Sequence, residues 1–153
     1  MNNAITPTLT TCGSGSRSLE KIVGGSDATQ THWPWIARLF LSSTVGGTSG
    51  NLCGAAIIND NWLISAAHCC DGKAEVTATF NDADRMSFEP GEFEMVSTEI
   101  FNHPMYGDAS DGNGSNMDIC LIKFSSSISA AGSGTAPVCL STSYPARKFF
   151  ECL

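Results

Sequence analysis

Residues 53–70 read CGAAIINDNWLISAAHCC, and this stretch decides the fold. It holds two short apolar runs, Cys53–Ile58 (CGAAII) and Trp62–Ser65 (WLIS). Short apolar runs of about four to eight residues, bounded by turn-forming residues, are typical of buried strands. The following Ala66–Cys70 (AAHCC) is expected to form one turn of helix. The stretch therefore predicts two strands and a helical turn that carries His68.

The apolar runs on either side of this stretch are equally short. Strands are expected at Trp33–Leu41 (WPWIARLFL), residues 74–80 (AEVTATF), Phe93–Phe101 (FEMVSTEIF) and Asp118–Phe124 (DICLIKF). Residues 74–80 alternate apolar and polar side chains, the period of a half-buried strand. Residues 106–117 are rich in Gly, Asp and Asn, and residues 125–136 in Ser, Gly and Ala, so both are expected to be connections. The pattern predicts an all-β domain of about six strands, enough to close one small barrel.

Charge and hydropathy exclude several classes of function. The 153 residues carry a net charge of −7 with eight Lys and Arg, which form no cluster, so nucleic acid is not an expected partner. No apolar run reaches the roughly 18 residues of a membrane span. No cofactor is expected. The acidic stretch between residues 71 and 94 could form a calcium loop, but its carboxylates show no recognisable ligand spacing, so no metal is predicted. They are Asp82, Asp84, Glu89, Glu92 and Glu94.

Seven cysteines are many for this length and indicate an oxidising compartment. Residues 1–21 are polar and are expected to be a leader outside the core. Residues 1–11 have neither a basic nor an apolar region, so they are not a signal peptide. Two explanations stay open: a secreted protein whose true start lies upstream, which the cysteine spacing favours, or a cytosolic protein with unusual thiols.

Three features carry chemistry. A lone histidine in an apolar run is most often structural, but His68 follows a strand that would fix its backbone, as a general base requires. Asp118 opens an apolar strand, where it is either a turn residue satisfied by backbone N–H groups or an orienter of an imidazole. Fifty residues separate the two, so spacing alone does not decide. The bond between Lys21 and Ile22 lies in a polar leader and is a plausible cleavage site, although a Gly-Gly turn explains the segment equally well.

Together these motifs, in this order, resemble the trypsin/chymotrypsin family of serine proteases. The resemblance implies that His68 is the general base, Asp118 its partner, and Lys21–Ile22 the zymogen activation bond, cut by an activating protease. It also implies a six-stranded antiparallel Greek-key barrel, the first half of a chymotrypsin-like double barrel. Residues 1–21 would then be a leader or propeptide. Residues 22–153 would be the N-terminal barrel and the start of the interdomain linker, without the second barrel.

The resemblance further implies how the cysteines pair. It joins Cys53 to Cys69 beside the histidine, and Cys12 to Cys139, the bridge that retains a propeptide. If His68 and Asp118 touch, their neighbours are also close, and the remaining two cysteines can then form a bridge. These are Cys70 and Cys120. Cys152 is left unpaired, because its counterpart in the family lies in the second barrel.

The nucleophile of the family lies in a Gly-Asp-Ser-Gly-Gly segment, which these 153 residues do not contain. Ser133 lies between two glycines in an Ala/Gly linker without an oxyanion-hole setting, so we do not assign it as nucleophile. The chain alone is therefore expected to be inactive, and a full-length enzyme to act on proteins or peptides. Alternatives are a truncated, non-catalytic secreted binding protein and a cytosolic thiol protein. Asn113, in an Asn-Gly-Ser sequon, is a candidate glycosylation site.

Overall fold

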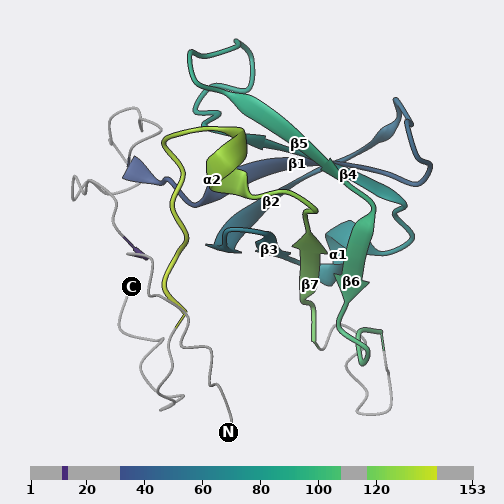
Figure 1. The fold of residues 1–153 in the computed structure, drawn as a ribbon. Helices are drawn as coiled ribbons and strands as arrows, with labels where there is room; N and C mark the ends of the chain where they lie inside the picture. Colours follow the sequence, from purple (N-terminus) through teal and green to yellow (C-terminus); the bar gives the residue numbers. More distant parts are fainter. Residues whose placement is uncertain (1–11, 14–31, 108–116, 141–153) are drawn as a thin grey trace, which may run out of the picture.

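A computed structural model describes residues 12–13, 32–107 and 117–140 of the chain. The described residues form seven strands and two one-turn helices (Figure 1). The strands are β1 (Ile36–Ser42), β2 (Gly50–Asn59), β3 (Trp62–Ser65), β4 (Glu75–Phe80), β5 (Phe93–Ser97), β6 (Glu99–Asn102) and β7 (Cys120–Lys123), and the helices are α1 (Ala67–Cys70) and α2 (Ile128–Ala131). The expected all-β class is confirmed. None of the described helices has the length and apolar character needed to cross a bilayer.

The strands form one antiparallel sheet that curls back on itself. Their order is β5-β4-β1-β2-β3-β7-β6, so β5 and β6 are the two edges. Only Thr98 separates these edge strands along the chain, which forces the two edges of the sheet to meet (Figure 1). The buried Ser97 hydroxyl donates a hydrogen bond to the carbonyl oxygen of Lys123 in β7, at 2.5 Å. This bond links the end of β5 to the opposite side of the sheet.

The expected count of six strands differs from the seven observed. Residues 93–101, expected as one strand, are divided at Thr98 between β5 and β6. The backbone N–H of Glu99 donates to the Ser97 hydroxyl at 3.0 Å, and this local bond stabilises the bend. The connection at 125–136 also contains the one-turn helix α2, which is capped by Ser127 and anchored by the buried Ile128. Both differences involve single turns of chain that side-chain periodicity does not reveal.

The core fills the inside of the curl. In β1 and β4 every second residue is buried: the pattern includes Leu39, Leu41 and Val76, each 0% exposed. Phe80 is at the centre, stacked on Phe93 with ring centroids 4.9 Å apart. Alternate burial follows from the period of two in a strand, and each large buried side chain contributes roughly 1.5–3 kcal/mol.

A second apolar line runs across the outside of the sheet. Residues paired directly opposite one another in antiparallel strands point to the same face. The pairing register of β1, β2, β3, β7 and β6 aligns five apolar residues in this way, which we call the outer apolar row. They are Ile36, Ala56, Ile64, Leu121 and Phe101. The two end members are 50% and 47% exposed, so this face of the sheet is not covered by the described residues.

Candidate active site

Strand pairing brings His68 and Asp118 to the same end of the sheet. β3 and β7 are antiparallel neighbours, and Ser65 at the end of β3 lies opposite Cys120 at the start of β7. His68 follows Ser65 by three residues, and Asp118 precedes Cys120 by two. The register therefore settles what spacing along the sequence leaves open.

Both oxygens of the Asp118 carboxylate bind the turn that carries His68. Oδ1 accepts the backbone N–H of His68 at 2.8 Å, and Oδ2 lies 2.7 Å from Nδ1 of the His68 ring. The N-cap of α1 is Ala66, which offers no side-chain acceptor, so Asp118 supplies this capping bond from a distant part of the chain. The two interpretations of Asp118 left open by the sequence thus coexist: one oxygen satisfies the backbone and the other orients the imidazole.

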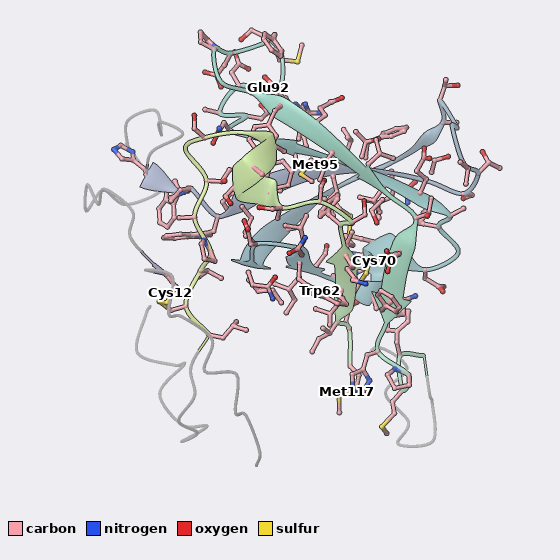
Figure 2. All side chains as sticks on the ribbon, in the orientation of Figure 1. Cys12, Trp62, Cys70, Glu92, Met95 and Met117 are labelled. Carbon is pink, nitrogen blue, oxygen red and sulfur yellow. A yellow bond between two sulfur atoms is a disulfide. The ribbon has the colours of Figure 1, made fainter. Side chains whose placement is uncertain are left out.

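The backbone around Asp118 is tightly turned. The N–H of Ile119 donates to the carbonyl of Met117 at 2.7 Å, so Asp118 lies at the centre of a very short turn. Met117 itself has φ of 58°, in the left-handed region that residues other than glycine rarely adopt. Figure 2 shows Met117 ahead of the first residue of β7, Cys120. This turn directs the Asp118 carboxylate back toward α1, and such local strain is common at functional positions.

The hydrogen bonds also determine the protonation of the pair. They hold the pKa of the Asp118 carboxyl below its ordinary value, chiefly through the bond from the His68 ring and next through the His68 N–H. Asp118 is therefore an ionised acceptor at neutral pH, and Nδ1 must carry the proton that it accepts. Nε2 of the neutral ring then carries a lone pair, and its contact at 3.5 Å is the disulfide sulfur of Cys69, which has no hydrogen to donate to it. The His68 side chain is 63% exposed, so this lone pair is accessible to a reacting group.

The described residues form three disulfides, and two of them lie next to the pair in sequence. They join Cys53 to Cys69, Cys70 to Cys120, and Cys12 to Cys139, with Cα–Cα distances of 6.3, 6.4 and 4.9 Å. These are the three pairs named from the sequence. The other expected sites lie outside the described residues: Lys21, Ile22, Asn113 and Cys152.

One group of side chains in the described residues has its ligand atoms close enough together for a metal ion. The ligand atoms of Cys53, Cys69 and His68 lie within 4.8 Å of one another, but the two sulfurs are bonded to each other, so neither is a thiolate. In the acidic stretch, Arg38 pairs with Asp82 and lies 3.8 Å from Glu92, so two of these carboxylates already share one guanidinium.

Sequence reasoning named the carboxylates of Asp82 and Glu92 but missed Arg38 as their partner. The signal available was that Arg38 is the one charged residue in the apolar run 33–41. Ser133 also has a structural contact, since its carbonyl oxygen accepts a hydrogen bond from the Asn81 side-chain amide at 2.7 Å.

Comparison with known proteins identifies the family of the chain. The family model named Trypsin matches residues 22–149. Ovochymase from Halocynthia roretzi is 33% identical over 120 residues, which cover 78% of this chain and 7% of that protein. Human serine protease 56 is 34% identical over 126 residues, 82% of this chain and 19% of that protein. Human chymotrypsin-like elastase family member 1 is 30% identical over 109 residues, 71% of this chain and 40% of that protein.

The chain thus matches less than half the length of each of these relatives. The family model nevertheless covers most of its residues, including every strand described above and both members of the His68–Asp118 pair. The chain belongs to the trypsin family of serine proteases.

Proposed function

We propose that this chain carries the proton-transfer half of a secreted serine endopeptidase, in which His68 is the general base and Asp118 its orienting partner. The observation that supports this most directly is the two-oxygen contact of Asp118 with the His68 backbone and ring. Family membership supports hydrolysis of peptide bonds as the reaction class. The three disulfides favour an extracellular location.

In this proposal the nucleophilic serine comes from sequence beyond these 153 residues. Its hydroxyl would lie against Nε2 of His68, which removes the proton as the oxygen attacks the scissile carbonyl. The same nitrogen then gives the proton to the leaving amine. Asp118 keeps Nδ1 protonated throughout and stabilises the imidazolium that forms between these two steps. General base catalysis of this kind contributes roughly 10²–10⁴-fold to the rate.

The arrangement of domains is part of the same proposal. Residues 1–21 form a propeptide that is cut after Lys21 and stays attached through the Cys12–Cys139 bridge. The curled sheet is the first of two Greek-key barrels. The outer apolar row is where a second barrel would pack, since adjoining apolar side chains that are left partly exposed can mark an interface. The whole enzyme would act on proteins or peptides.

Peptidase assays on two proteins test the proposal. The 153-residue chain is expected to hydrolyse no peptide substrate above the level of its His68→Ala variant, because it has a base but no nucleophile. The longest in-frame product of its transcript is expected to be active after cleavage at Lys21, and to lose activity on the same substitution. A transcript that ends at Leu153 and yields a secreted protein of this length would instead support a non-catalytic binding protein.

A further inference from the structure

The turn of helix that carries His68 is held by its surroundings, since its other three residues, Ala67, Cys69 and Cys70, are buried. α1 is four residues long, and a helix this short has no stability in water by itself. Its N-cap residue, Ala66, makes no side-chain capping bond. The His68 side chain is largely exposed and gains little from packing. The position of the imidazole is therefore set by the links between α1 and the strands around it.

Two adjacent cysteines of α1 form disulfides to different strands. Cys69 is joined to Cys53 of β2, whereas Cys70 is joined to Cys120, the first residue of β7. β3 lies between β2 and β7 in the sheet, so the bridge to β2 does not fix the distance from His68 to Asp118. Of the three disulfides in the described residues, only Cys70–Cys120 connects the His68 turn to the strand that follows Asp118.

This bridge and the hydrogen bonds of the pair close one small ring. Cys70 lies two residues after His68, and Cys120 lies two residues after Asp118. The path from the hydrogen bonds to the disulfide therefore passes through only one residue on each side, Cys69 and Ile119. Both bridge cysteines are buried, at 2% and 0% exposure, and Figure 2 labels Cys70 at α1 beside β6 and β7.

We propose that the Cys70–Cys120 disulfide is a positioning element for the His68–Asp118 pair, and this inference rests on the proposed function. The covalent link holds α1 against the start of β7, so that the Asp118 carboxylate stays within hydrogen-bond distance of the His68 ring. Without the link, the one-turn helix can shift while the sheet stays intact. A displacement of about 1 Å at a catalytic pair is enough to cost roughly a hundredfold in rate.

The tautomer of the His68 ring tests this in the 153-residue chain itself. ¹⁵N NMR, recorded above the pH range in which imidazole titrates, reports which ring nitrogen carries the proton. The parent chain is expected to hold the proton on Nδ1, because Asp118 accepts it. In the variant Cys70→Ala/Cys120→Ala, the ratio of Nδ1–H to Nε2–H is expected to fall by about tenfold or more, as for the loss of a charge-assisted hydrogen bond.

A second disulfide provides the matched control. Cys12–Cys139 spans 127 residues and Cys70–Cys120 spans 50, so a purely entropic role predicts the larger stability loss for the variant Cys12→Ala/Cys139→Ala. That variant is expected to keep the parent tautomer ratio. An unchanged ratio in Cys70→Ala/Cys120→Ala, or an equal change in both variants, overturns the inference.

Two further variants keep the outcomes distinct. In the parent background, Asp118→Asn must itself change the tautomer ratio. If it does not, Asp118 does not set the tautomer of His68, and the proposed function is wrong whatever the disulfide does. Cys70→Ala/Cys120→Val preserves more volume at the buried Cys120. If neither bridge variant gives a dispersed amide spectrum, the bridge is needed by the whole fold, and a positioning role is wrong.

Discussion

Two regions of this molecule place carboxylates beside a nitrogen-containing side chain, and they differ in how far the carboxylates are buried. In the His–Asp pair, Asp118 and His68 have side chains that are 36% and 63% exposed. In the Arg38 cluster, formed by Arg38 with Asp82 and Glu92, the two carboxylates are only 4% and 9% exposed. Both lie on the same curled sheet, and both join segments far apart along the chain. Only the first leaves a nitrogen lone pair accessible to a reacting group.

The difference in burial assigns the two regions different roles: the buried Arg38 cluster stabilises the fold, and the exposed His–Asp pair can react. A buried carboxylate without a partner is expensive, so Asp82 and Glu92 depend on the guanidinium of Arg38. The guanidinium is a permanent cation and cannot accept a proton. The imidazole of His68 can, and its exposure reduces the stability that the pair contributes. We therefore expect substitutions in the two regions to affect different measurements.

The largest expected effect belongs to Asp118→Asn in the full-length enzyme. The amide cannot hold the Nδ1–H tautomer, so kcat should fall by about 10⁴-fold, the loss measured for this change in a Ser-His-Asp triad. The free energy of unfolding of the 153-residue chain should change far less than for an Arg38 variant, because the side chain is partly exposed. Peptidase kinetics and urea unfolding measure the two quantities. Near-normal activity in a folded Asp118→Asn enzyme would contradict the assignment.

Arg38→Met should have the reverse profile. Removing the guanidinium leaves two buried carboxylates uncompensated, which typically costs about 3–5 kcal/mol; we expect about 3 because Arg38 is 32% exposed. The tautomer of His68 should be unchanged under folding conditions. Arg38→Lys is the control, since one ammonium cannot reach both carboxylates as a guanidinium fork does. Its free energy of unfolding should lie between those of the parent chain and Arg38→Met. If the free energy of unfolding measured in urea falls by less than about 1 kcal/mol, the cluster does not stabilise the fold as expected.

The titration of Asp118 should reveal the same contact without altering the fold. Its pKa is lowered in the folded chain, so the stability it provides is present above about pH 4, the value of the unfolded chain, and is lost as pH falls through the lower folded pKa. ¹³C NMR of the carboxyl group should give a midpoint that rises in His68→Ala, where the main cause of the lowering is removed. Equal midpoints in the two chains would show that the ring does not bind Asp118 in solution.

The smallest effect is expected for Lys123→Met, which matches Arg38→Met in chemistry but not in burial. Lys123 pairs with Glu99 at 3.2 Å, and both side chains are more than 40% exposed. Exposed pairs contribute about 0–1 kcal/mol, so urea unfolding should change by no more than about 0.5 kcal/mol. If Lys123→Met lowers the free energy of unfolding as much as Arg38→Met does, burial does not explain why the two ion pairs differ in stability.

The sequence predicts the strands better than their closure. The runs around Leu39, Ile57, Leu63 and Ile122 are short and bounded by turns, and each became a strand. The bend at Thr98 was missed, because no Gly or Pro marks it between Phe93 and Phe101 and its local cause is one hydrogen bond from the Glu99 N–H to the Ser97 hydroxyl.

The sequence identifies the residues of the site but does not show that they are in contact. Motifs around His68 and Asp118 identify both, yet their meeting depends on the pairing of Ser65 with Cys120, which no local pattern encodes. The Arg38 cluster was missed for the same reason, since Asp82 lies 44 residues away and meets Arg38 only through the β1–β4 pairing.

The most direct test of the central claim is covalent labelling of the longest in-frame product of the transcript by a fluorophosphonate, which reacts with an activated serine. After cleavage at Lys21, we predict labelling at a serine beyond residue 153, with the labelling rate falling by at least about 10³-fold in His68→Ala. Labelling that is insensitive to His68→Ala, labelling within these 153 residues, or no labelling at all would contradict the claim that His68 and Asp118 serve a serine nucleophile.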